Sequence, residues 1–282
     1  MNPSAPTIDW QPPSSHPPLA ENEIHVWATT LSVAPAILEK FASTLSADER
    51  ERVNRFKFEK HRNRYLAGRG ALRAMLAPYF GTHAAGLRFE YLENGKPALT
   101  GEFANAGIHF NLAHTGDLAL AAITRVGMIG VDVESVRPIK NVDELVARFF
   151  SPRESKLFQK LSEDQKPAAF FNLWTRKEAM LKATGEGITR SLNLVEVSFL
   201  PGDMARVVAI SGDAKAGERW CLRELWPAKG FTGAVAVEWE TLNIEHRTPN
   251  VEGETSNIQH RTSNIQGMPQ IDIKCWKWNC ES

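Results

Sequence analysis

The chain has 282 residues, 43% of them hydrophobic and 23% charged, a composition typical of a soluble globular protein. Lys and Arg number 33 and so do Asp and Glu, so no net charge draws the protein to nucleic acid or to a membrane surface. Three scattered cysteines argue against a disulfide framework or a zinc site and favour a reduced, cytoplasmic location. We find neither a secretory signal at the start nor an apolar run of about 18 residues, so no membrane span is expected.

The first part of the chain predicts a disordered arm followed by an α+β half. Residues 1–20 are rich in Pro and Ser and lack the apolar content that a packed core needs. From residue 21 to 126, a predicted strand precedes helices and then further strands. Within this half, Ser46 and Glu49 have the spacing of a capping box at a helix start, and Gly81 lies where a helix C-cap is expected.

The second part of the chain repeats the order of helices followed by strands. In residues 127–240, a helical region from about Val142 to Thr184 precedes four predicted strands. We therefore expect an α+β protein of two similar halves, divided near Arg125–Gly127. Residues 241–282 contain a polar near-repeat, NIEHRTPNV and then NIQHRTSNI, which is too short for a solenoid and predicts a low-complexity repeat tail.

The segment IGVDVESV predicts a strand with two carboxylates on one face. Side chains alternate along a strand, so Val131 and Val133 point one way and Asp132 and Glu134 the other. Two carboxylates about 7 Å apart repel unless a cation lies between them, and Mg²⁺ prefers oxygen ligands. The alternative is the solvated outer face of an edge strand, because such pairs often occur by chance.

The segment FNLWTRKEAMLKATGEG predicts a helix that adds a third carboxylate. Trp174, Glu178 and Lys182 follow one another at four-residue spacing and so share one stripe of the helix. Glu178 could join the metal ligands, with Lys182 facing the anion that the metal binds. The alternative is a surface Glu–Lys pair, which contributes about 0.3–0.5 kcal/mol.

A basic run extends from Arg50 to Arg73, with nine Lys and Arg residues against two acidic ones. Such runs are usually a solvated helix face. Nucleic acid is a further alternative, but aromatic residues between the charges are few and no nucleic-acid motif occurs. A small polyphosphorylated molecule fits better, and Lys96 and His114 could add phosphate contacts. The sequence contains neither a P-loop nor a dinucleotide-binding glycine fingerprint.

Five segments, taken together and in order, resemble the 4′-phosphopantetheinyl transferases of the Sfp type: RFKFEKHRNRYLAGRGALR, NGKPAL, FNLAHTGDLALAAI, GVDVESVRP and FNLWTRKEAMLKATGEG. The resemblance runs from about Leu45 to Gly187, and the strands up to about Glu240 suit the second half of that fold. It implies two α+β halves packed as a pseudo-dimer within a monomeric chain. Coenzyme A would donate its phosphopantetheine arm to a serine of an apo acyl or peptidyl carrier protein and release adenosine 3′,5′-bisphosphate. A non-catalytic module that binds coenzyme A or a carrier protein is the alternative.

The resemblance also implies roles for single residues. Asp132, Glu134 and Glu178 would hold Mg²⁺ on the coenzyme A diphosphate, with Glu178 as candidate general base and Lys182 at the leaving phosphate. A neighbouring cation would lower the pKa of Glu178, so it could act through a metal-bound water. The positions that the family uses around the coenzyme A phosphates are Arg52, Arg64, Arg69, Lys96 and His114. We assign no role to Glu49, where some relatives have a lysine, or to Lys177.

Overall fold

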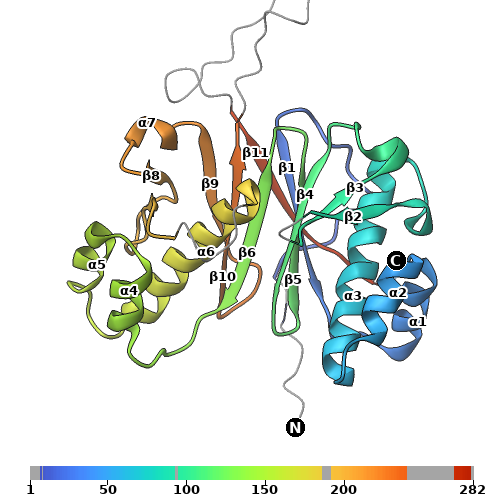
Figure 1. Cartoon of the computed structure of the whole chain (residues 1–282), viewed down its shortest axis with the longest axis horizontal. Helices are drawn as coiled ribbons and strands as arrows, with labels where there is room; N and C mark the ends of the chain where they lie inside the picture. Colours follow the sequence, from blue (N-terminus) through green and yellow to red (C-terminus); the bar gives the residue numbers. More distant parts are fainter. Residues whose placement is uncertain (1–6, 8, 93–94, 186–191, 240–269, 281–282) are drawn as a thin grey trace, which may run out of the picture.

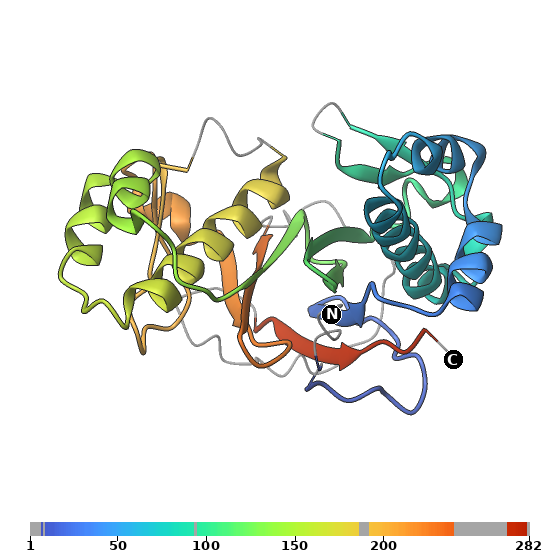
Figure 2. The same cartoon turned by 90° about the horizontal axis from the view of Figure 1, so that it is seen from below.

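Two β-sheets meet in the middle of the molecule, and helices lie on their outer sides (Figure 1). The computed structural model describes residues 7, 9–92, 95–185, 192–239 and 270–280. The N-terminal half contains one sheet with its helices, and the C-terminal half contains the other (Figure 2). The predicted α+β fold of two similar halves packed as a pseudo-dimer is confirmed.

The elements of the first half follow the predicted order of strand, helices and strands. In chain order they are β1 (Glu23–Thr30), α1 (Pro35–Thr44), α2 (Ala47–Asn54), α3 (Glu59–Leu76), η1 (Ala77–Phe80), η2 (Ala84–Gly86), β2 (Phe89–Tyr91), β3 (Pro97–Leu99), η3 (Gly101–Phe103), β4 (His109–Thr115) and β5 (Leu118–Thr124), where η marks a 3-10 turn. Gly81 follows η1 with a φ of 60°, as its predicted capping position requires.

The second half repeats this order. Its elements are β6 (Ile129–Ser135), α4 (Val142–Phe149), α5 (Pro152–Phe158), α6 (Lys166–Thr184), β7 (Val195–Val197), β8 (Val207–Ile210), α7 (Ala214–Gly217), β9 (Trp220–Leu225) and β10 (Phe231–Glu238), and β11 (Asp272–Lys277) follows near the end of the chain. None of the described helices combines the length and the apolar character that crossing a membrane requires.

The strand order repeats between the two halves. The first sheet has the order β11-β1-β5-β4 and the second the order β6-β10-β9. The antiparallel trio β1-β5-β4 therefore corresponds to β6-β10-β9, with β1 and β6 in equivalent places. Two short hairpins, β2–β3 and β7–β8, also correspond, because each follows the long helix of its half.

The inner faces of the two sheets form a shared hydrophobic core. Alternate residues of β1 and β6 enter it: Ile24, Val26, Ala28, Ile129, Val131 and Val133. The predicted inward direction of Val131 and Val133 is thus confirmed. The intervening residues of β6 face α6, so the core fixes the register of the strand that carries the predicted acidic pair.

Described segments near both ends of the chain contact the first half. β11 lies parallel to β1, and its residues alternate between two cores: Ile273 and Cys275 face the core between the halves, while Trp276 faces the core under α3. The backbone amide of Lys277 donates to the carbonyl of Gln11, at 3.1 Å. Residues 9–20 thus lie within the predicted disordered arm, and β11 lies within the predicted low-complexity tail. The near-repeat itself lies outside the described residues, and the domain limits stay a prediction.

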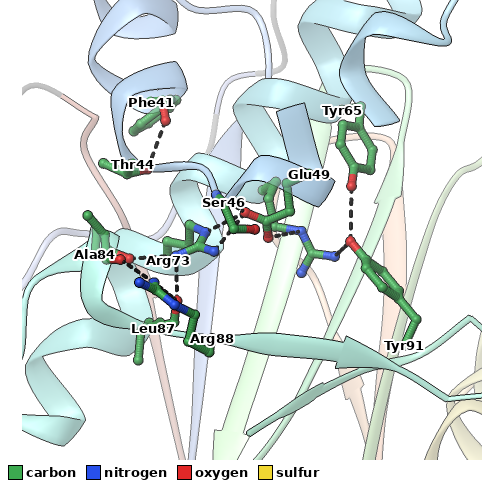
Figure 3. Close-up of polar contacts among 12 residues, drawn as sticks. Phe41, Thr44, Ser46, Glu49, Tyr65, Arg73, Ala84, Leu87, Arg88 and Tyr91 are labelled. Atoms are coloured by element: carbon green, nitrogen blue, oxygen red, sulfur yellow. Dashed lines mark hydrogen bonds and ion pairs between the residues drawn. The ribbon is translucent and has the colours of Figure 1, made fainter. Parts of the chain in front are cut away.

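The halves also repeat a buried ion pair. The predicted capping box at the start of α2 is present, and the buried carboxylate of Glu49 also contacts Arg73 of α3 at 2.7 Å (Figure 3). In the second half, Ser151 and Glu154 form a capping box at the start of α5, and Glu154 contacts Lys177 of α6 at 2.6 Å. Each pair ties a short helix to the long helix of its half.

Candidate active site

Close packing of α6 on β6 assembles the site. A Cβ atom at Gly130 would lie 2.0 Å from the carbonyl oxygen of Ala179 and 2.5 Å from the amide of Ala183. Only glycine lets the helix approach the strand this closely. The close approach brings Asp132 on β6 next to Glu178 and Lys182 on α6.

Asp132 is a buried carboxylate that pairs with Lys182. The ammonium group of Lys182 donates to its Oδ1 at 2.6 Å, while its Oδ2 has no hydrogen-bond partner. Burial disfavours the charged form and raises the pKa of Asp132 to about 6, although the charge of Lys182 opposes this effect. The second oxygen is therefore available to a cation.

Glu178 is 3% exposed, and its Oε1 also lacks a hydrogen-bond partner. Burial, and then the charge of Asp132, raise the pKa of Glu178 to about 7. The sequence predicts a lowered pKa for Glu178 when a metal cation is bound next to it. Without the cation, the surrounding protein raises this pKa instead. Two buried carboxyl groups thus share the single ammonium group of Lys182.

Glu134 completes the predicted carboxylate trio from a more open position. It accepts a hydrogen bond from Thr115 Oγ1 on β4 at 3.0 Å and lies 3.5 Å from Arg137. Its charge acts on both Asp132 and Glu178, raising the pKa of each. The sequence pattern did not point to Thr115, because this contact crosses from one half to the other.

The donor chemistry of the trio suits a hard divalent cation. All three carboxylates offer oxygen ligands, and two of them, Asp132 and Glu178, hold a buried oxygen without a partner. Within the described ranges, no three His, Cys, Asp or Glu side chains already stand at metal-ligand spacing. The fit therefore rests on the two orphaned oxygens of Asp132 and Glu178, with Glu134 beside them.

The first half contributes three of the predicted cationic residues near this site. Lys96 Nζ donates to the carbonyl of Lys182 at 2.7 Å and to that of Ile129 at 3.0 Å, and burial lowers the pKa of Lys96 to about 8. His114, near the end of β4, is exposed, but partial desolvation of its ring and then the charges of Lys182 and Arg64 lower its pKa. Lys96 therefore joins the two halves at the base of the site.

Arg64 and Asp117 form an ion pair at the rim, with 2.7 Å between Arg64 Nε and Asp117 Oδ1. Both side chains are about four-fifths buried, at 20% and 18% exposure. The pair fixes the position of Arg64 and leaves its terminal nitrogens as further donors.

The two remaining predicted cations, Arg52 and Arg69, form a second group on α2, α3 and β2. Arg69 is buried, lies 3.1 Å from Glu49 and donates to the hydroxyl of Tyr91. Arg52 is exposed and lies over the rings of Tyr65 and Tyr91. The two tyrosines were not predicted, because nothing in the local sequence shows that they meet.

Lys177, which the sequence left without a role, is a structural residue. Its fully buried ammonium group donates to Glu154 and to the carbonyl of Leu192, both at 2.6 Å, and to the carbonyl of Val195. It thereby joins α5 and the segment before β7 to the helix that carries Glu178. The Ser151–Glu154 spacing was the available sequence signal for its partner.

A groove of about 450 Å³ lies beside Glu134. Its walls come from the segment after β6, from α4 and from α6, and its lining is mainly apolar: Pro138, Ile139, Leu145, Phe149, Phe170, Phe171 and Trp174. Arg137 and Lys140 add positive charge to the lining. Trp174 therefore borders the groove, one helix turn before Glu178.

Comparisons with known proteins identify the family. Residues 32–125 match the 4′-phosphopantetheinyl transferase N-terminal model, and residues 128–233 match the 4′-phosphopantetheinyl transferase superfamily model. The 4′-phosphopantetheinyl transferase HetI of Nostoc sp. is 40% identical over 228 residues, which cover 81% of this chain and 93% of HetI. The chain belongs to the 4′-phosphopantetheinyl transferase superfamily. The family resemblance seen in the sequence is thus confirmed at this level.

Two other similarities cover less of the chain. The 4′-phosphopantetheinyl transferase Sfp of Bacillus subtilis is 30% identical over 159 residues, which cover 56% of this chain and 68% of Sfp. Among solved structures, the chain is similar to the holo-[acyl-carrier-protein] synthase of Helicobacter pylori in complex with coenzyme A. The match covers 39% of this chain and 99% of the synthase, with 24% identity and a TM-score of 0.28.

Proposed function

We propose that this transferase moves the 4′-phosphopantetheine arm of coenzyme A to a serine of an apo acyl or peptidyl carrier protein, in a Mg²⁺-dependent reaction of the Sfp type. The observation that carries this proposal is the cluster of Asp132, Glu178 and Lys182, in which two buried carboxylate oxygens lack a hydrogen-bond partner and an ammonium group lies beside them. Such a group can bind a divalent cation and an anionic diphosphate side by side. The enzyme acts as a monomer in the cytoplasm.

Asp132, Glu178 and Glu134 would hold the Mg²⁺ ion. When bound, the ion would neutralise charge on the diphosphate and orient it. The raised pKa values of Asp132 and Glu178 support this assignment, because they reflect burial with too little positive charge nearby. Lys182 alone cannot neutralise both carboxylates.

The residues around this site suit attack by a hydroxyl group on a diphosphate. The serine oxygen forms a bond to the phosphorus atom on the pantetheine side, the bridging P–O bond breaks, and adenosine 3′,5′-bisphosphate leaves. Glu178 is the candidate acceptor of the serine proton, and because the cation it would hold lowers its pKa, it would act either directly or through a water molecule. Lys182 stabilises the negative charge that develops on the leaving phosphate.

The five cationic residues Arg52, Arg64, Arg69, Lys96 and His114 serve coenzyme A binding in different ways. The charges of Lys182, Arg64 and Glu134 all act on His114, so we expect His114 and Arg64 to face the diphosphate. Lys96 holds the carbonyls of Ile129 and Lys182 and so shapes the site.

The groove beside Glu134 is the place where we expect the carrier protein to dock. Its apolar lining accepts an apolar side chain, and Arg137 and Lys140 favour an acidic partner surface. A carrier bound there presents its serine beside Glu134 and Glu178.

Intact-mass spectrometry tests the function directly. The transferase is incubated with coenzyme A, Mg²⁺ and a panel of apo carrier proteins, and a phosphopantetheine mass gain is expected on at least one carrier. Asp132→Ala and Glu178→Gln should each slow transfer by on the order of 10²–10⁴-fold, since each removes a group that acts on the reacting atoms. Glu163→Gln removes an exposed carboxylate that pairs with Lys166 and serves as the matched control.

Two outcomes contradict the proposal. Transfer to no carrier, together with coenzyme A binding in calorimetry, would favour the non-catalytic binding module instead. Near wild-type rates in both Asp132→Ala and Glu178→Gln would reject the assignment of the metal site while leaving the reaction in place.

A further inference from the structure

Two tyrosines outside the assigned site form a hydrogen-bonded pair. Tyr65 on α3 and Tyr91 on β2 lie with their hydroxyl oxygens 3.0 Å apart (Figure 3). Arg69 donates a further hydrogen bond to the Tyr91 hydroxyl. The two rings are thus held together across two elements, although 26 residues separate them in the chain.

The guanidinium group of Arg52 rests on this tyrosine pair. Its central carbon lies 4.8 Å from the ring centroid of Tyr91 and 5.5 Å from that of Tyr65. Unlike its neighbour Arg55, which pairs with Glu51 at 2.6 Å, Arg52 has no ion pair with a described carboxylate. Two aromatic rings hold this exposed guanidinium group in place, and it has no carboxylate counter-ion among the described residues. It is therefore available to bind an anion.

Arg69, which bonds to Tyr91, belongs to a buried ion-pair cluster with an excess of positive charge. The buried carboxylate of Glu49 contacts both Arg69 and Arg73, so two cations share one anion. The ring of Phe89 lies 5.1 Å from each of these guanidinium groups. Glu49 fixes the position of Arg69, which in turn fixes that of Tyr91.

We propose that Tyr91, together with Tyr65, is a positioning residue that presents Arg52 to the 3′-phosphate of coenzyme A. This inference rests on the function proposed above. Of the anionic groups of coenzyme A, the diphosphate reacts and must lie at Asp132 and Glu178, so the remaining phosphate is the one on the ribose. A terminal phosphate suits a guanidinium group, which can donate two parallel hydrogen bonds to it.

The test compares coenzyme A with 3′-dephospho-coenzyme A as donors. Tyr91→Leu removes the ring under Arg52 and should raise the KM for coenzyme A by about threefold to tenfold, with kcat unchanged. The KM for 3′-dephospho-coenzyme A should stay the same. Tyr91→Phe keeps the ring and loses only the hydroxyl, so its effect should be smaller.

A double-mutant cycle connects the tyrosine to the arginine. Arg52→Ala should reduce the preference for coenzyme A over 3′-dephospho-coenzyme A at least as much as Tyr91→Leu does. The double variant should have the same KM for coenzyme A as Arg52→Ala alone. Tyr79→Phe is the matched control, because the Tyr79 hydroxyl bonds to Trp27 and His25 in another part of the same half. Thermal melting verifies that each variant is folded.

The inference and the proposed function fail in different ways. Equal rises in KM for both donors, or additive effects of Tyr91→Leu and Arg52→Ala, would overturn the positioning role while transfer itself stands. If no carrier is modified, calorimetry still compares the two nucleotides directly. If the wild type then binds coenzyme A and 3′-dephospho-coenzyme A with equal dissociation constants, the positioning role is wrong, whatever the outcome for the proposed function.

Discussion

The carboxyl group of Glu178 shows how burial sets the chemistry of a single residue. Its nearest charged neighbours are another carboxylate, Asp132, and the ammonium group of Lys182, which is already bonded to Asp132. The folded, metal-free protein therefore favours the protonated form of Glu178 up to a pKa of about 7. The raised pKa of Glu178 thus results from burial in the folded protein and cannot be read from the local sequence around it.

The raised pKa predicts a pH-dependent gain in stability for Glu178→Gln in the absence of divalent metal. Between the ordinary pKa of a glutamate side chain, 4.5, and the folded value of about 7, the folded state binds more protons than the unfolded state. Stability of the wild type then falls as pH rises through this window, by on the order of 2–3 kcal/mol from this group. Urea denaturation with chelator at pH 5 and pH 8 should show the variant gaining relative to the wild type at the higher pH.

The exposed control Glu163→Gln should show the same difference from the wild type at both pH values. A constant difference for Glu178→Gln as well would mean that Glu178 titrates normally in the folded protein, and the account of its burial would be wrong.

The residue types of the site could be predicted from the sequence, but their partners could not. Strand alternation placed Asp132 and Glu134 on one face, and helical spacing placed Glu178 in line with Lys182. The sequence does not reveal which carboxylate oxygen remains without a partner, because Lys182 lies 50 positions beyond Asp132. The same holds for Tyr65 and Tyr91.

At the scale of elements, the buried pair of Glu154 and Lys177 joins α5 to α6. Glu154 also accepts hydrogen bonds from the backbone amides of Ser151 and Val197, each at 3.0 Å. The capping-box pattern at Ser46 and Glu49 predicted a helix start correctly, but no pattern shows that such a carboxylate also binds a cation on the long helix.

Lys177→Met should destabilise the protein by about 3–5 kcal/mol, because it leaves the charge of Glu154 buried without its counter-ion. The double variant Lys177→Met/Glu154→Gln should recover part of this loss, since glutamine is neutral and still accepts a hydrogen bond. Chemical denaturation measures both free energies of unfolding. A double variant that is less stable than Lys177→Met would contradict the role of the buried charge.

At the scale of the whole molecule, β11 connects the end of the chain to its beginning. It occupies the outer edge of β1, and its Lys274 pairs with Glu23 while the ring of Trp276 lies 5.1 Å from that of Trp27. The sequence could not predict this pairing, because the two strands lie at opposite ends of the chain.

Removal of residues 270–282 should lower the melting temperature and promote self-association. Without β11, the β1 strand presents unpaired backbone groups at the edge of the sheet. Calorimetric melting and light scattering on a sizing column measure the two effects. Trp276→Ala keeps the strand and should fall between the truncated protein and the wild type. A truncated chain that melts like the wild type and stays monodisperse would show that β11 adds no stability.

Contacts across the middle of the molecule have a consequence for dilute solutions. Lys96 and Thr115 of the first half reach backbone and side-chain oxygens of the second, so both sides of the site come from one polypeptide. Tethering keeps two such surfaces at an effective concentration of about millimolar, whatever the amount of protein present. Dilution that would separate two weakly associated subunits leaves these halves together. Turnover per molecule should therefore stay constant down to very few copies.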